Sequence, residues 1–166
     1  MDCNTESEFQ VISFDIFDTL ITRKTFYPIG TFLIMQKRLE NRICGIDRKF
    51  IDNFPILRME AEHNARCAIK AAGGEETSLD VIYEELQQMG GLTQRNCEDI
   101  KKIEIEAEWD NIIPSKKYVR KLKRYYEMGE RIILISDMYL NAATIRELLS
   151  SVDSVFENIP IYVSSE

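Results

Sequence analysis

The sequence lacks the features that would point to several common functional classes. It has no excess of positive charge, because 28 acidic residues outnumber 21 basic ones and leave a net charge of −7, which would repel a nucleic-acid backbone. The four cysteines form no CxxC pair and no metal-site spacing, so we expect free thiols at Cys3, Cys44, Cys67 and Cys97. The only histidine, His63, has no second ligand at a suitable spacing, and we expect it at the surface.

Long apolar segments are also missing. The stretch MDCNTESEF is acidic and polar, unlike a secretory signal, and no apolar run approaches the roughly 20 residues that cross a bilayer. We therefore expect a cytoplasmic protein that binds neither membranes nor nucleic acids. A hydrophobic fraction of 45% in 166 residues is enough for one ordinary domain, or for a smaller core with an inserted helical piece.

Short β-branched apolar runs occur at residues 10–15 and 131–136, and a third begins at Ile161. Such runs are typical of strands buried on both faces of a parallel sheet. The stretch between the first two carries helical signals and is too long for a loop. We predict an α/β fold in which residues 1–25 and 113–166 form a partial parallel sheet of about three strands with its helices, and residues 26–112 form a helical insertion.

Capping residues and helix breakers place the individual helices. The first two are expected from Pro28 to near Gly45 and from about Asp47 to Ala72, with a break or kink in the second at Pro55. The signals for the others are Thr77 or Ser78 before LDVIYEELQQM, Thr93 before a helix reaching about Asn111, Pro114 before a helix ending at Gly129, and Asn141 before AATIRELLS.

Two patterns within the insertion favour structural roles. Arg58, Glu62 and Arg66 repeat every four residues, which predicts a surface row of ion pairs, although part of the row could face a substrate cleft. Trp109 has apolar neighbours on the same helix and is expected in the core.

Apolar faces are also expected on the helices that follow the insertion. The basic run at residues 116–124 predicts an amphipathic helix, with Val119, Leu122 and Tyr126 on its apolar face, rather than an anion-binding patch. The apolar face of the AATIRELLS helix comprises Ile145, Leu148 and Leu149.

The most informative segment is VISFDIFDTLITR at residues 11–23. Asp15 and Asp18 follow an apolar strand directly, where Gly, Asn or Ser is the usual turn residue, and this suggests chemistry. A second predicted strand ends at Ser136 and is followed by Asp137. Because ligands of parallel sheets lie beyond the carboxyl ends of the strands, we expect Asp15 and Ser136 at the same functional edge.

An aspartate in this position can act as a covalent nucleophile toward phosphorus or an activated carbon, and water then resolves the intermediate. Phosphoryl transfer would require Mg²⁺ held by hard oxygen ligands. Ser136 could orient the nucleophile or donate to a substrate oxygen. Taken separately, Asp18 and Thr19 could cap a turn, and Ser136 and Asp137 could form an ordinary strand-to-helix connection. Their occurrence at one sheet edge favours the functional interpretation.

The segment FDIFDTL resembles the first signature of the haloacid dehalogenase (HAD) superfamily, and IILISDMYL resembles its second. More closely, SFDIFDTLITR, RMEAEHNAR, the EIEAEWDNIIP region and SDMYL resemble a bacterial subgroup of predicted HAD hydrolases that is often linked with surface-polysaccharide genes. The resemblance covers nearly the whole chain. It implies a HAD-like Rossmannoid core with an inserted helical cap of the C1 type.

The resemblance also implies roles for individual residues. Asp15 would be the nucleophile and a Mg²⁺ ligand, and Phe17 would offer its backbone carbonyl to the metal. Thr19 would support the loop and the substrate site, Ser136 would bind the transferring group, and Asp137 beside it would contribute to substrate binding.

The loop departs from the superfamily's phosphatases at one position. Their general acid/base is an Asp two residues after the nucleophile, but Phe17 holds that place here, and Asp18 follows where Gly is usual. Asp18 is the candidate for the missing acid, which makes Asp15, Asp18 and Ser136 the predicted catalytic set. An aromatic residue at this position resembles the dehalogenase branch, which acts on carbon without Mg²⁺.

The superfamily's third and fourth signatures supply a Lys and one or two Asp after the third strand, whereas this sequence ends at IYVSSE. We therefore expect a truncated product, fragment or domain excerpt with an incomplete site, and an exposed apolar edge at the Asp15 strand. The leading hypothesis is a Mg²⁺-dependent phosphohydrolase acting on a small phosphorylated metabolite such as a sugar phosphate. The alternatives are dehalogenase-like hydrolysis and a catalytically incomplete binding or assembly module.

Overall fold

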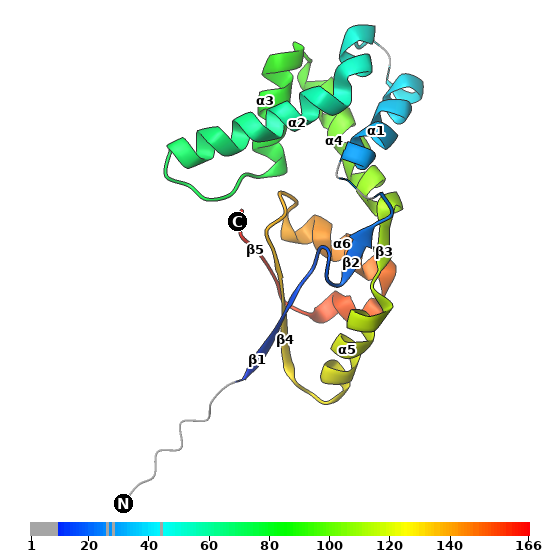
Figure 1. Cartoon of the computed structure of the whole chain (residues 1–166), viewed down its shortest axis with the longest axis vertical. Coiled ribbons are helices and arrows are strands. Elements are labelled where there is room, and N and C mark those ends of the chain that lie inside the picture. The colour runs from blue at the N-terminus through cyan, green and yellow to red at the C-terminus, as the bar shows by residue number, and fades with distance from the viewer. Residues whose placement is uncertain (1–9, 26, 28, 44) are drawn as a thin grey trace, which may run out of the picture.

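Three parallel strands form the main sheet of the structure, a computed structural model that describes residues 10–25, 27, 29–43 and 45–166 (Figure 1). β1 (Val11–Asp15) pairs with β4 (Arg131–Ser136), and β4 pairs with β5 (Ile161–Val163), in the order β1-β4-β5. These strands match the three predicted runs, so an α/β protein with a small parallel sheet is confirmed. Within this part of the chain β1 is an edge strand, as expected.

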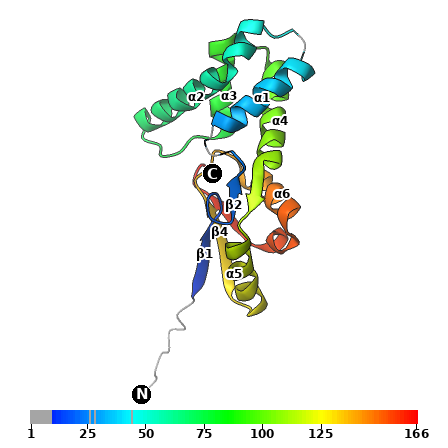
Figure 2. The ribbon, with the colours of Figure 1, turned by 45° about the vertical axis from the view of Figure 1, so that its right-hand side comes forward.

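Helices cover one face of this sheet in both views (Figures 1 and 2). They are α5 (Lys116–Glu127), α6 (Ala142–Val152) and the 3₁₀ helix η1 (Ser154–Asn158). Phe14 and its register partner Leu134 are buried on this face, whereas Val11, Ile135 and Tyr162 are exposed. The expectation that the strands are buried on both faces is therefore wrong for the described residues.

A second sheet has two short strands. β2 (Ile21–Arg23) pairs antiparallel with β3 (Ile112–Pro114). The sequence pattern predicts neither strand, because three residues are too few to show an alternation. Pro114 therefore ends a strand instead of starting α5, and the next residue, Ser115, donates its N–H to the Leu20 carbonyl at 2.8 Å.

Four helices of the described residues lie between β2 and β3, beyond the carboxyl ends of the parallel strands (Figures 1 and 2). They are α1 (Ile29–Arg42), α2 (Arg48–Ala71), α3 (Leu79–Gly90) and α4 (Gln94–Asn111). α1 packs against α2 and α4, and α2 packs against α3. Asp47, Ser78 and Thr93 cap α2, α3 and α4, so Ser78 rather than Thr77 caps α3. Pro28, the predicted start of the first helix, lies outside the described residues.

α2 runs through Pro55 without interruption, so the predicted break is wrong, whereas the alternative of a kink stays a prediction. A proline inside a helix removes the N–H that would bond the carbonyl four residues earlier, which here belongs to Ile51. The side-chain amide of Gln36 on α1 donates to that carbonyl and to the Asp52 carbonyl, both at 2.9 Å. The neighbouring helix thus supplies the donor that Pro55 lacks.

Two aromatic side chains are more exposed than their helical spacing predicts. Tyr126 is 46% exposed and Trp109 is 39% exposed, so the predictions of a buried face for Tyr126 and a core position for Trp109 are wrong. On α5, Tyr125 lies next to the sheet instead, with its ring centroid 6.3 Å from that of Phe14. The remaining predicted apolar positions are buried: Val119, Leu122, Ile145, Leu148 and Leu149.

The thiols of Cys67 and Cys97 are free, as expected. Cys3 and Cys44 lie outside the described residues. His63 is exposed, as predicted. No helix in the described part of the chain is long and apolar enough to cross a membrane.

Candidate active site

The chain makes a tight loop directly after β1. The Ile16 N–H still donates to the Ile135 carbonyl of β4 at 3.2 Å, which continues the strand pairing beyond Asp15. The Ile16 carbonyl accepts from the N–H groups of Leu20 and Ile21, at 2.9 and 3.0 Å. Backbone hydrogen bonds therefore hold the Asp15 loop between β1 and β2.

Asp15 presents its carboxylate to solvent at the carboxyl end of β1. The Thr19 hydroxyl donates to its Oδ2 atom at 2.8 Å, which restricts the rotation of the carboxylate. The other oxygen, Oδ1, accepts no hydrogen bond from the residues that the structure describes. One oriented and one available oxygen are a suitable arrangement for a nucleophile or a metal ligand.

Asp18 has a left-handed backbone, with φ at +59°, and no other non-glycine residue described here has a positive φ. The Thr22 hydroxyl donates to its Oδ1 atom at 3.3 Å. Asp tolerates this conformation better than most residues, yet it carries a backbone cost that often marks functional loops. Its side chain is exposed on the Asp15 loop.

Ser136 lies at the same edge, because Asp15 pairs with the residue before it, Ile135. Its side chain, however, is only 1% exposed, and its hydroxyl accepts from the Met138 N–H at 3.1 Å. A hydroxyl can accept one hydrogen bond and still donate another, so this contact leaves the Ser136 proton available. Asp137 is exposed next to it. The two predicted segments therefore meet, but the Ser136 side chain is less accessible than the sequence suggests.

Few metal donors surround the Asp15 carboxylate. Within the described residues, no group of three or more His, Cys, Asp or Glu side chains could hold a metal ion. Mg²⁺ does not need such a group, because it commonly takes one or two carboxylates and completes its shell with waters and substrate phosphate. The exposed Asp15 carboxylate fits that pattern, with the Phe17 carbonyl as the second ligand that the resemblance implies, whereas a Zn²⁺ site would require more nitrogen or sulfur ligands.

Arg23 and Glu108 form an ion pair next to this loop, which the sequence does not predict. The Arg23 guanidinium, on β2, contacts the Glu108 carboxylate through Nε–Oε2 at 2.9 Å and Nη2–Oε1 at 3.1 Å. It also lies over the Phe17 ring, 5.4 Å from the centroid. Burial raises the pKa of Glu108, although Arg23 opposes that shift. The pair connects the Asp15 loop to α4.

Arg58 is fully buried, so the predicted surface row of ion pairs is wrong at this residue. Its guanidinium donates to both oxygens of buried Glu104, at 2.8 and 2.7 Å, and to Glu62 at 3.1 Å. The Tyr83 hydroxyl also donates to Glu104 at 2.8 Å. The Glu62–Arg66 part of the row is more exposed and forms its ion pair as expected. The sequence does contain a signal for the burial of Glu104, since this residue shares a helical face with the apolar α4 residues Ile100 and Ala107.

Tyr139 connects the loop after β4 to the helices. Its ring stacks on the Arg58 guanidinium, 5.0 Å from the centroid, and its carbonyl accepts from the Leu79 N–H at 2.8 Å. Burial raises the pKa of Tyr139 well above its ordinary value, with the Glu104 charge adding to the rise and Arg58 opposing it. The phenol is therefore protonated at neutral pH.

A cavity of about 580 Å³ lies between α1, α2 and the loop after β4, and we call it the helix-side cavity. Phe32, Met59, Met138 and Tyr139 are among its lining residues. Arg23 and Arg66 also line it. Arg23 therefore lines this cavity and also contacts Phe17 of the Asp15 loop.

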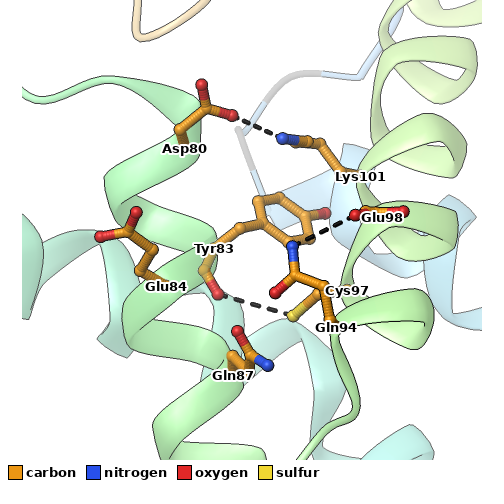
Figure 3. A pocket seen from close by; sticks show the side chains of 8 residues that line it. All are labelled: Asp80, Tyr83, Glu84, Gln87, Gln94, Cys97, Glu98 and Lys101. Carbon is orange, nitrogen blue, oxygen red and sulfur yellow. Dashed lines mark hydrogen bonds and ion pairs between the residues drawn. The ribbon is translucent and has the colours of Figure 1, made fainter.

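Another cavity, of about 340 Å³, lies between α3 and α4 (Figure 3). Four of the polar residues that line it form two pairs: Lys101 contacts Asp80 at 2.5 Å, and Gln94 donates to Glu98 at 3.2 Å. The buried Cys97 thiol donates to the Tyr83 carbonyl at 3.6 Å, and burial raises its pKa. These contacts indicate packing between helices rather than a reactive site.

Comparison with known proteins finds no family model that matches this chain and no curated protein that matches it.

Proposed function

We propose that this chain is a HAD-type, Mg²⁺-dependent phosphohydrolase that forms an aspartyl-phosphate on Asp15 and acts on a small phosphorylated metabolite. The observation that carries the proposal is the Asp15 carboxylate, which is exposed at the carboxyl end of β1 with one oxygen held by Thr19. Its other oxygen has no hydrogen-bond partner among the described residues. Helices α1–α4, beyond this edge of the sheet, would serve as the cap.

In the proposed reaction, an Asp15 oxygen bonds to phosphorus while the bond between phosphorus and the ester oxygen breaks. The leaving oxygen takes a proton, for which the Asp18 carboxyl is the candidate donor. Water then attacks the phosphorus and gives a proton back to Asp18, and the bond to Asp15 breaks to release phosphate. Mg²⁺, held by Asp15 and the Phe17 carbonyl, would neutralise the phosphate charge. Ser136 can donate its hydroxyl proton to a phosphate oxygen.

The test is hydrolysis of p-nitrophenyl phosphate by the whole chain, with Mg²⁺ and with EDTA. Asp15→Asn preserves an acceptor for the Thr19 hydroxyl, so the loop should fold, but turnover should fall by roughly 10³-fold or more. Asp52→Asn, on the exposed surface of α2, is the matched control and should leave turnover unchanged. Turnover that survives in Asp15→Asn would contradict the proposal.

A catalytically incomplete binding module is the second candidate. It is favoured by the surroundings of Asp15, whose carboxylate forms no ion pair with any cation that the structure describes. A folded protein that binds ligands but hydrolyses no phosphate ester with Mg²⁺ would support it. Mg²⁺-independent release of chloride from a 2-chloroalkanoate would instead support dehalogenase-like chemistry.

A further inference from the structure

We propose that the helix-side cavity binds an uncharged aromatic or branched apolar group, so that the substrates are phosphate esters of apolar alcohols or phenols rather than sugar phosphates. The assignment of the phosphate half of such a substrate rests on the function proposed for Asp15. The binding of the apolar half rests on the cavity alone.

The walls of the helix-side cavity are largely apolar. Ile29 and Phe32 come from α1, Met59 comes from α2, and Met138 and Tyr139 come from the loop after β4. Its volume of about 580 Å³ lies within the range of small-molecule sites, which are commonly apolar with a few polar groups. Polar side chains also reach the cavity, His63 and Glu62 among them, but a sugar ring would still bury part of its hydroxyl groups against Ile29, Phe32 and the two methionines, which cannot hydrogen-bond to them.

The charges that line the cavity already compensate one another. Arg23 is held by Glu108 at 2.9 Å, and Arg66 is held by Glu62 at 3.1 Å and by Glu76 at 2.7 Å. Both guanidiniums are therefore already paired with carboxylates of the chain, and a second phosphate or a ligand carboxylate would have to compete with those pairs. This balance favours an uncharged group and disfavours nucleotides and sugar bisphosphates.

The Tyr139 side chain supplies one polar anchor. It is 6% exposed and lines the cavity, yet its hydroxyl forms no hydrogen bond with the rest of the described chain. The phenol is protonated, as its raised pKa indicates, and can therefore donate to an oxygen of the bound group.

Two contacts connect the cavity with the candidate active site, one at Ser136 and one at the Asp15 loop. Met138, which lines the cavity, donates its N–H to the Ser136 hydroxyl at 3.1 Å. Arg23, which also lines it, lies over the Phe17 ring at 5.4 Å. An ester could therefore place its phosphate at the loop and its apolar group in the cavity.

The direct test is equilibrium binding of 1-naphthol, which has no phosphate, measured by fluorescence with the whole chain. Met59→Glu places a charge on the cavity wall and should weaken binding by at least about tenfold. Ile56→Glu is the matched control, because Ile56 is also exposed on α2 but does not line the cavity, and it should bind like the wild type. Tyr139→Phe keeps the ring over Arg58 and should weaken binding roughly threefold to tenfold. Equal affinities of the two Glu variants, or no binding by the wild type, would overturn the proposal.

A second measurement separates this inference from the proposed hydrolase. Asp15→Asn should bind 1-naphthol with unchanged affinity while losing hydrolysis of 1-naphthyl phosphate. If naphthol binds but wild-type protein hydrolyses no ester, the cavity assignment stands and the hydrolase proposal fails. If hydrolysis of glucose 6-phosphate is as efficient as that of 1-naphthyl phosphate, and Met59→Glu affects neither, the cavity assignment fails and the hydrolase proposal stands.

Discussion

Gln36 on α1 donates its side-chain amide to the carbonyl of Ile51 on α2, at 2.9 Å. This carbonyl would otherwise lack its helical partner, because the residue four positions later is Pro55. A hydrogen bond between two helices therefore supports a continuous helix at the position where the sequence predicts a break or kink. The same contact holds α1 against α2, and both helices line the helix-side cavity.

This relationship predicts coupling between Gln36 and Pro55. Gln36→Ala should lower the free energy of unfolding by about 1–2 kcal/mol, because it leaves the Ile51 carbonyl without that donor. In a Pro55→Ala background the restored N–H can bond Ile51, so Gln36→Ala should cost less than about 0.5 kcal/mol. Urea denaturation of the four proteins of this double-mutant cycle measures the coupling. Equal costs in both backgrounds would show that Gln36 does not substitute for the missing N–H.

The buried pair of Arg58 and Glu104 predicts a large loss of stability on neutralisation. Glu104→Gln should lower the free energy of unfolding by about 3–5 kcal/mol, because it leaves a buried guanidinium without its main counter-charge. Glu106→Gln is the matched control on the same helix, since exposed Glu106 pairs with exposed Arg42 and should cost at most about 1 kcal/mol. Chemical denaturation compares the two variants, and similar costs would contradict the assigned difference in burial.

The left-handed backbone of Asp18 predicts that stability and activity respond differently to substitution. Asp18→Gly should leave the free energy of unfolding unchanged or slightly higher, whereas Asp18→Ala should lower it by about 1 kcal/mol. If Asp18 is the general acid, both variants should lose phosphatase turnover by roughly 10²–10⁴-fold. Thermal unfolding and kcat measurements on both proteins separate the effects. Full turnover in a stable Asp18→Gly protein would exclude the acid role.

The lowered pKa of the Asp153 carboxyl predicts that this residue contributes to the free energy of unfolding in a pH-dependent way. The Lys123 ammonium, at 2.6 Å, and the Val155 N–H lower the pKa of this carboxyl below its ordinary value of 3.8. A carboxyl whose pKa is lowered in the folded state stabilises the protein above 3.8, and this contribution disappears as the pH falls through the folded pKa.

The variant Asp153→Asn retains an acceptor for Val155 and removes only the charge. It should lower the free energy of unfolding by about 0.5–1 kcal/mol at pH 7, a modest value because solvent screens this partly exposed pair, and by almost nothing near pH 2. Urea denaturation at both pH values measures this difference. Lys123→Met should show the same pH dependence, and a cost for Asp153→Asn that is equal at both pH values would contradict the ion-pair explanation.

Local sequence signals predicted most of the helices and strands. Thr93 and Asn141 cap α4 and α6 as expected, because a capping hydroxyl or amide acts on N–H groups only two or three residues away. The three parallel strands could also be predicted from local sequence, because a short β-branched run can be recognised without knowledge of its partner strand. The β2–β3 pair could not be predicted in this way, because each strand has only three residues and its partner lies beyond four helices in the sequence.

In the candidate site, too, some features could be predicted from the sequence and others required the tertiary structure. The sequence by itself determined that Asp15, Asp18 and Thr19 share one loop, since adjacent residues cannot separate, and the parallel strands bring Ser136 to the same edge. Only the tertiary structure decided that the Ser136 side chain is buried.

Tertiary structure alone also brings Arg23 to Glu108 and Arg58 to Glu104, across 85 and 46 positions of sequence. Charged residues at helical spacing look like surface residues, because spacing reports which face they share but not what covers that face. Burial of those charges depends on how α1, α2 and α4 pack together, and the same packing brings Phe32 and Met59 into the lining of the helix-side cavity.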